Sequence, residues 1–265
     1  MTENERLDYI KKFKVAIRPR SPWQKVNEKY DLDLAIWIQQ RTLYIMFQGS
    51  SSKIDWKLNL SFWKKPYKDM TEKIYVHSGQ ITGYKSARDF IHNYFLEHKK
   101  EIDNVHIGGH SLGDSYARFC YMDFFWHKEN KTDYHRLNLS GLGGGGNKNV
   151  SWIGHKEANR RLEGYVRLQN GNDIVPRIPP IFYKQTGKQV IINKPSWWSY
   201  FLLLPSHFYH HNPSSYLGYL KDPKTFKDTE ENNYALPIAK KWLKRFYFGV
   251  FFLLVFGVII AKVRW

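Results

Sequence analysis

Hydrophobic and polar positions follow strand periodicity through much of the first third of the chain. Residues 33–39 and 42–47 are two apolar runs separated by a short polar turn, which predicts a β-hairpin. In residues 53–63 apolar and polar positions alternate, and this period of two indicates an extended, half-buried segment. Residues 74–76 predict a short strand. Residues 85–99 carry apolar side chains at helical spacing, so a helix follows.

The next apolar run, residues 105–107, ends in a glycine pair, turns at Ser111 and continues into a helical pattern that reaches about His127. Gly109 to Gly113 match the G-x-S-x-G pattern in the strand–turn–helix context of a nucleophile elbow. Side chains at the two glycines would collide with the strand and the helix. Because the three fixed positions recur by chance in about one chain in ten of this length, an ordinary glycine-rich turn is the alternative reading.

Further strands are predicted over residues 137–142 and 165–169, and residues 143–146 predict a flexible glycine loop. Residues 181–183 and 189–192 suggest a hairpin. Strands that alternate with helices predict an α/β fold with a mostly parallel sheet flanked by helices. The functional residues of such a sheet gather at the carboxyl ends of its strands.

The chain divides into three regions of different character. Residues 1–30 form a polar, charged extension without the apolar core of a secretory signal. Residues 31–235 form the α/β domain, and residues 236–265 form a basic linker and a membrane anchor. The anchor is predicted because residues 246–261 carry no charge and are mostly Phe, Leu, Val or Ile.

Basic residues flank this apolar run, with Lys240, Lys241, Lys244 and Arg245 before it and Lys262 and Arg264 after it. Since positive charge is retained on the cytoplasmic side, we expect a single-pass C-terminal transmembrane helix with the domain in the cytosol. The alternative is a buried C-terminal helix, although such a helix rarely lacks a polar face.

Composition and charge narrow the choice of partners. With 42% hydrophobic and 17% aromatic residues the chain can bury a substantial core. A single cysteine, Cys120, excludes an intramolecular disulfide. The net charge of +17 favours polyanions, either an anionic membrane surface or nucleic acid. The basic residues are scattered and no nucleic-acid-binding motif is present, so we expect no specific nucleic-acid partner.

The elbow serine needs a base to take its proton and an acid to orient that base, and both are expected after it in the chain. Asp173 stands out because it follows a strand and precedes a rigid Ile-Val-Pro turn, although a residue of an Asx-turn would look the same. The histidine is one of three in the segment after residue 205. These are His207, His210 and His211.

Five spaced segments resemble the class 3 lipases, which are the fungal-type triacylglycerol lipases of the α/β-hydrolase fold. The segments are residues 47–56, 76–79, 109–113, 172–180 and 211–216, and the resemblance covers about residues 34–220. It implies Ser111 as the nucleophile, Asp173 as the acid and His211 as the base, because Tyr216 follows His211 at the family's spacing. The resemblance also implies an oxyanion hole made by Ser50 and the Leu112 N–H.

The chain departs from the family pattern at several positions. Gln48 stands where relatives usually have Arg, and Asp114 stands where they mostly have Gly. Residues 143–146 replace the usual Gly-x-Pro-Arg stretch, so the acyl pocket is expected to differ from that of the relatives. Residues 53–63 have strand periodicity where fungal relatives carry an amphipathic helical lid.

These observations predict a membrane-anchored serine hydrolase that cleaves lipid esters through an acyl-enzyme and needs no metal or cofactor. Two alternatives stay open. One is a catalytically silent hydrolase fold that binds membranes, and the other is an esterase or thioesterase for soluble substrates. The oligomeric state is not predicted from the sequence.

Overall fold

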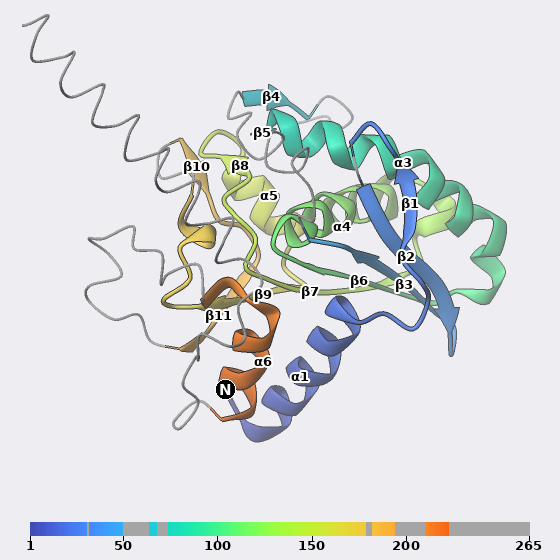
Figure 1. Cartoon of the computed structure of the whole chain (residues 1–265). Helices are drawn as coiled ribbons and strands as arrows, with labels where there is room; N and C mark the ends of the chain where they lie inside the picture. Colours follow the sequence, from blue (N-terminus) through green and yellow to red (C-terminus); the bar gives the residue numbers. More distant parts are fainter. Residues whose placement is uncertain (31, 50–63, 68–73, 179–181, 194–209, 223–265) are drawn as a thin grey trace, which may run out of the picture.

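The computed structural model describes residues 1–30, 32–49, 64–67, 74–178, 182–193 and 210–222. These residues form two sheets, and helices cover both faces of the larger one (Figure 1). The larger sheet has seven strands in the order β1-β2-β3-β6-β7-β9-β11. Their bounds are β1 Gln24–Asn27, β2 Leu32–Gln39, β3 Thr42–Phe47, β6 Asn104–His110, β7 Asn138–Gly144, β9 Tyr165–Asn170 and β11 Lys188–Asn193. The strands from β3 to β11 pair in parallel and β1, β2 and β3 pair antiparallel, so the predicted mostly parallel α/β sheet is confirmed.

The smaller sheet has four short antiparallel strands in the order β10-β8-β5-β4. Their bounds are β4 Lys64–Pro66, β5 Tyr75–His77, β8 Val150–Ser151 and β10 Tyr183–Lys184. Each of these strands follows the carboxyl end of a strand of the larger sheet in the chain, except β5, which leads into the next helix. The smaller sheet therefore belongs to the end of the domain where the larger sheet presents its strand carboxyl ends.

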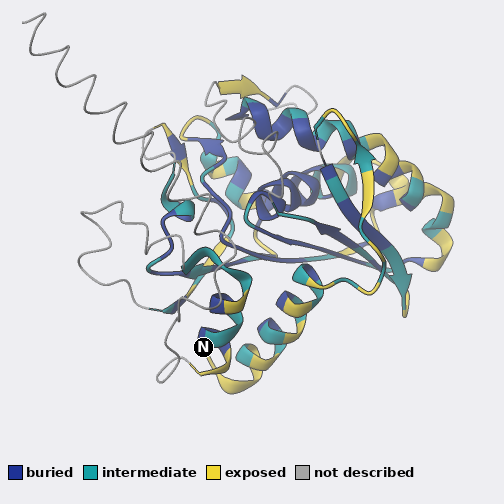
Figure 2. Cartoon of the chain, in the orientation of Figure 1, coloured by how far each residue is buried: buried dark blue, intermediate teal, exposed yellow. Residues whose placement is uncertain are grey.

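Helices α3, α4 and α5 lie on one face of the larger sheet, and α1 and α6 lie on the other (Figure 1). Their bounds are α1 Glu3–Ile17, α3 Ser78–His98, α4 Leu112–Asn130, α5 His155–Arg161 and α6 Pro213–Lys221, and short 3₁₀ turns occupy Lys99–Glu101, Thr132–Tyr134 and Val175–Arg177. The main hydrophobic core fills the space between the sheet and α3 and α4, and Figure 2 shows α4 buried along most of its length.

The first hairpin and the central strand–helix unit form as predicted. In the hairpin Gln40 and Arg41 both take positive φ, which is the two-residue turn whose twist matches that of the flanking strands. The guanidinium of Arg41 is bonded to the carboxylate of Asp103, just before β6. The turn of the hairpin is therefore fixed to the amino end of the central strand.

Two local predictions were wrong. Gly143 and Gly144 belong to β7 and pair with Gly109 and His110 of β6, so the glycine run is not a loop throughout. Residues 181–183 and 189–192 do not form a hairpin, because β10 pairs with β8 of the smaller sheet and β11 pairs with β9 in parallel. In each case a distant strand supplies the hydrogen bonds.

The prediction of a separate polar extension over residues 1–30 is also corrected by the structure. Thr2 caps α1 through a capping box with Glu5. Tyr9, Phe13 and Ala16 recur at helical spacing and are buried against the sheet and α6. The many charges of this segment lie on the other side of an amphipathic helix that completes the core.

The other regional predictions fall largely outside the described residues. Residues 53–63 and 246–261 lie outside them, as do the boundaries at residues 31, 235 and 236. Within the part of the chain that the structure describes, no helix has the length and apolar character needed to cross a membrane.

The packing of α1 predicts a clear stability effect. Phe13 is fully buried, and its ring stacks on Tyr216 at 5.7 Å between centroids. The Phe13→Ala substitution is expected to lower the free energy of unfolding by about 3–5 kcal/mol, the usual cost of emptying a buried aromatic site. Leu7→Ala on the exposed side of the same helix is the matched control and is expected to change it by less than about 0.5 kcal/mol. Equal effects in chemical denaturation would show that α1 does not pack as described.

Candidate active site

Ser111 stands at a sharp turn between β6 and α4, as the elbow motif predicts. Its backbone has φ 60° and ψ −127°, a conformation that costs a non-glycine residue of order 1–3 kcal/mol. A Cβ on Gly109 would come within 2.4 Å of the backbone of Gly113, and one on Gly113 would come within 2.2 Å of the Phe47 carbonyl. Both glycines are therefore required by close backbone approach at the turn.

Three of the predicted residues lie in one hydrogen-bonded line. The His211 Nε2 atom is 2.7 Å from the Ser111 Oγ, and the His211 Nδ1 atom is 2.8 Å from the Asp173 Oδ2. Asp173 is fully buried, whereas His211 is partly accessible. Since a carboxylate only accepts, the Nδ1 atom of His211 carries the proton and the Nε2 lone pair faces the serine hydroxyl.

The Asp-Ile-Val-Pro turn and Tyr216 hold the carboxylate of Asp173. The Val175 N–H donates to its Oδ1 at 2.9 Å, which is the Asx-turn that the sequence left open as an alternative. The Tyr216 hydroxyl donates to its Oδ2 at 2.6 Å. Burial, together with the charge of Asp173, raises the pKa of Tyr216 well above its ordinary value, so the hydroxyl stays a donor. The turn and the triad arrangement are thus compatible.

The three candidate histidines are not equivalent in position. The structure brings His211 to Ser111, whereas the backbone carbonyl of His210 accepts from the Asn170 side chain at 3.1 Å. His207 lies outside the described residues. The geometry is what the assignment of His211 as the base requires.

His110, inside the elbow, lies beside His211. Its ring lies 4.9 Å from the ring of His211, centroid to centroid, and it hydrogen-bonds the His211 backbone. Burial and the nearby His211 hold the pKa of His110 well below its ordinary value, so this imidazole is neutral. Gly145, at φ +72°, leaves the space in which the two rings meet, since a Cβ there would lie 3.0 Å from His211.

One half of the predicted oxyanion hole is described. Leu112 is the first residue of α4, so its N–H lies in the turn where a helix leaves its backbone donors without carbonyl partners in the helix. Gly49 lies beside the elbow, because a Cβ there would come within 2.9 Å of the His110 carbonyl. Ser50, the next residue and the other predicted donor, lies outside the described residues.

The unusual aspartate at position 114 and the unusual glycine run at residues 143–146 are explained by their contact with each other. The Asp114 carboxylate is fully buried, accepts from the Tyr165 hydroxyl at 2.7 Å and lies 3.4 Å from Arg118. A Cβ on Gly143 or on Gly146 would come within 2.0 Å of this carboxylate. The glycine run therefore makes room for Asp114, a steric pairing that the local pattern does not reveal.

Arg118 connects this buried carboxylate to the segment before β8. Its guanidinium donates to the Asn147 carbonyl at 2.6 Å and to the Asn149 side chain at 2.9 Å. Asn147 also accepts from Ser115 at 2.8 Å. Through these bonds the first turns of α4 hold the segment that leads from the site to the smaller sheet.

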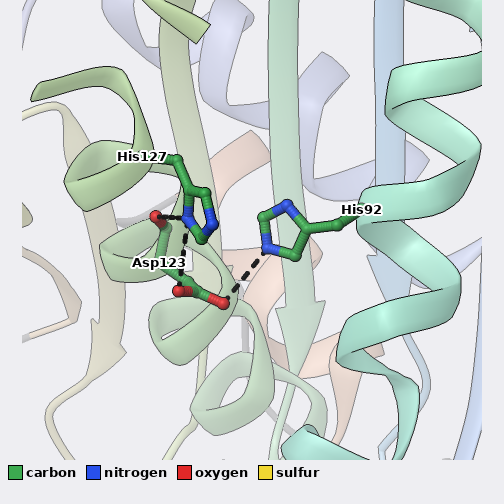
Figure 3. Close-up of side chains that lie close together, drawn as sticks. All are labelled: His92, Asp123 and His127. Carbon is green, nitrogen blue, oxygen red and sulfur yellow. Dashed lines mark hydrogen bonds and ion pairs between the residues drawn. The ribbon is translucent and has the colours of Figure 1, made fainter. Parts of the chain in front are cut away.

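A second cluster of titratable side chains lies between α3 and the second half of α4. Figure 3 shows its three members (His92, Asp123 and His127). The Asp123 carboxylate accepts hydrogen bonds from two guanidinium nitrogens of Arg88, at 2.6 and 3.0 Å, and lies 3.1 Å from the Nε2 atom of His92. Burial alone would raise the pKa of Asp123, but hydrogen bonds from His127, His92 and Arg88 hold it well below its usual range. A metal ion would have to displace the guanidinium, so this cluster is a paired polar network.

A family model described as lipase (class 3) matches residues 44–183 of the chain. A lipase of Rhizomucor miehei is 28% identical over 147 residues, which is 53% of this chain and 38% of the length of that relative. The chain thus spans well under half of it.

Solved structures show the same fold. The triacylglyceride lipase of Rhizomucor miehei superposes with a TM-score of 0.60 at 20% identity, over 72% of this chain and 82% of that one. A lipase of Rhizopus microsporus var. chinensis gives 0.59 at 20% identity, over 72% and 76%. A triacylglycerol lipase whose catalytic centre is a serine-protease triad gives 0.57 at 21% identity, over 72% and 82%.

The bond from Tyr216 to Asp173 generates a test at the site. Tyr216→Phe removes only the hydroxyl, so one acceptor site of a buried carboxylate loses its donor, at a cost of about 1–3 kcal/mol. We expect ester hydrolysis to fall about 5- to 100-fold in kcat with KM nearly unchanged, because the hydroxyl orients the acid and contacts no substrate. Tyr219→Phe, on the same helix, is the control. A loss confined to KM would contradict the orienting role.

Proposed function

Because the chain belongs to the class 3 lipase family, we propose that it is a serine-dependent acyl ester hydrolase acting on lipid esters at a membrane. The observation that carries the proposal is the continuous line of hydrogen bonds from Ser111 through His211 to Asp173. A nucleophile, a base and an orienting acid in this geometry are the minimum that acyl transfer requires. Similarity to the lipase of Rhizomucor miehei supports an ester of a lipid as the substrate.

In the proposed reaction His211 takes the proton from the Ser111 Oγ as this oxygen attacks the ester carbonyl. The ester oxygen becomes an oxyanion, which the Leu112 N–H stabilises together with Ser50. Each such donor contributes about 3–4 kcal/mol to lowering the barrier. His211 then gives its proton to the leaving alcohol, and the acyl group remains on Ser111.

A water molecule completes the proposed cycle. His211 removes a proton from this water, which attacks the acyl-enzyme and releases the fatty acid, and the proton returns to Ser111. Asp173 stays ionised throughout and stabilises the protonated imidazole of His211. Every proton transfer is carried out by the chain's own residues, so neither a metal nor a cofactor has a step to perform.

The membrane part of the proposal comes from the amino-acid sequence. The uncharged residues 246–261 and the basic residues before them favour a C-terminal anchor that leaves the domain in the cytosol. The net charge of +17 favours an anionic leaflet. Such an anchor would keep the site close to a lipid substrate.

The catalytic assignment is tested by single substitutions. Ser111→Ala and His211→Ala are expected to lower ester hydrolysis by at least about a thousandfold, because losing a member of such a triad removes the activated nucleophile. His210→Ala, one residue from His211, is the matched control and is expected to keep activity within about threefold of the wild type. Hydrolysis of a chromogenic ester is measured, with circular dichroism as the folding check. If His210→Ala is the inactive variant and His211→Ala is active, the assignment of the base is wrong.

The anchor is tested by fractionation of cells that express the full chain or a version ending at Pro237. The full chain is expected to resist carbonate extraction, and protease added to intact vesicles from the cytosolic face is expected to digest its domain. The shortened version is expected to be released by high salt, because only surface charge would hold it. Extraction of both proteins by carbonate would contradict the anchor, and protection of the domain from protease would contradict the orientation.

A further inference from the structure

The smaller sheet carries an exposed aromatic surface close to the candidate active site. Trp152 and Phe182 are the two most exposed large apolar side chains among the described residues, at 61% and 60%. Ile153, next to Trp152 in the chain, is 47% exposed. Trp152 follows β8 and Phe182 precedes β10, and the Trp152 N–H donates to the Phe182 carbonyl at 3.4 Å. We call Trp152, Ile153, Phe182 and Lys64 the aromatic–lysine surface.

The lysine of this surface comes from β4, an edge strand of the smaller sheet. The Lys64 Nζ atom lies 4.6 Å from the ring centroid of Phe182 and 5.8 Å from that of Trp152. All three residues of β4 are exposed, as Figure 2 shows. The Lys64 ammonium and the two exposed rings together place a positive charge beside apolar surface. Side chains that lie at a membrane–water interface have this combination of charge and apolar area.

Within the described residues, the strands of the smaller sheet carry only positive charge. The four strands of the smaller sheet contain Lys64, Lys65 and Lys184 and no acidic residue. Glu157, on the helix that follows, is paired with Arg160 and Arg161. The partner that complements exposed aromatic rings beside a lysine is an anionic lipid surface, because the lysine meets its head groups while the rings enter the interfacial layer.

The backbone of Phe182 gives an independent indication. Its φ is +68°, an outlier for a bulky residue, and strain of this kind costs of order 1–3 kcal/mol. Burial of the ring does not compensate for it, because the ring is largely exposed. A strained backbone that presents an apolar ring to the outside is expected where the ring has a partner.

The surface and the candidate active site are linked by a short, well-bonded segment. Gly145 contacts the His211 ring, and Trp152 follows only seven residues later, so the two lie within roughly 24 Å of each other. Between them Asn147 and Asn149 are bonded to Arg118 of α4, and the Asn149 carbonyl accepts from the His77 N–H of β5. A lipid surface at Trp152 therefore lies at the same end of the larger sheet as the site that would take its esters.

We propose that the aromatic–lysine surface docks the domain onto an anionic lipid surface, at the end of the larger sheet that carries Ser111 and independently of any C-terminal anchor. This inference rests on the proposed function, since the substrate of that function resides in such a surface. Docking would fix the orientation of the domain, so that a lipid ester reaches Ser111 from the membrane.

Site-specific fluorescence tests the docking directly. Cys120 is the single cysteine of the chain and is buried, so a thiol-reactive, polarity-sensitive dye reacts only with an introduced cysteine. The dye is placed by Ile153→Cys and, in a second protein, by Phe182→Cys, both in the full chain carrying Ser111→Ala so that the lipid stays intact. The control is Leu96→Cys, an exposed position on α3 about 27 Å along the helix from Ser78.

With phosphatidylcholine–phosphatidylserine vesicles the dyes at positions 153 and 182 are expected to shift to the blue and to be quenched by lipids with a quencher in the acyl chain. The dye at position 96 is expected to do neither, even if the C-terminal segment holds the protein on the vesicle. Replacing Lys64 with Gln is expected to lower the docked-to-undocked ratio reported at position 153 about fivefold, since a lysine near an anionic leaflet contributes roughly that factor. Matching thermal unfolding shows that the variants are folded.

Three results would overturn the docking proposal. The first is the absence of a lipid-dependent shift at both 153 and 182, and the second is an equal shift at 96. The third is a shift at 153 that follows protein concentration without lipid, which would identify the surface as a contact between protein copies. Ester hydrolysis by the unlabelled wild-type protein is measured separately, so a failure of the proposed function is distinguished from a failure of docking.

Discussion

The strained backbone at Ser111 is the constraint on which the rest of the site depends. The serine holds a positive φ because β6 is paired on both sides, with β3 and β7, and because the Ser111 N–H donates to the Gly144 carbonyl at 2.9 Å. Because Gly109 and Gly113 have no side chains, the strand and the helix approach each other so closely that a Cβ at either position would clash with backbone atoms. The turn places the hydroxyl beside His211 at the start of α4, where a helix presents free backbone donors. The pairing of the central strand thus fixes the position of the Ser111 hydroxyl oxygen.

The partners of that oxygen come from the far end of the chain and are fixed by a second set of contacts. Tyr216 of α6 bonds Asp173 through its hydroxyl and stacks its ring on Phe13 of α1. Phe13 and Tyr216 both also meet the ring of His110, which lies against His211. The N-terminal helix therefore supports His211 and Asp173 from the face of the sheet opposite α4. Helix α1, whose sequence suggested a charged extension, thus contacts the candidate active site through the rings of Phe13, Tyr216 and His110.

The sequence predicted what depends on local pattern and missed what depends on distant partners. The hairpin, the elbow and the strand before Asp173 have periodicity and turn chemistry that point to one structure. The strands around residues 183 and 190 were located, but their partners, β8 and β9, cannot be read from local spacing. In α1 the apolar positions do have helical spacing, yet the surrounding charges masked it. Within the site, Ser111 and Asp173 follow from motifs, whereas choosing His211 among three neighbouring histidines required the family resemblance. The fit of Asp114 between Gly143 and Gly146 is steric and becomes visible only in three dimensions.

The central claim is that Ser111 is a nucleophile activated by His211 and Asp173. The most direct measurement is labelling of the full chain with a fluorophosphonate, followed by mass spectrometry of its peptides. An activated serine attacks the phosphorus and keeps it covalently, whereas an ordinary surface serine does not react. The account predicts one adduct, on Ser111, whose rate of formation falls by orders of magnitude in the His211→Ala protein. An unlabelled Ser111 in a folded protein, or labelling that is as fast without His211, would contradict it.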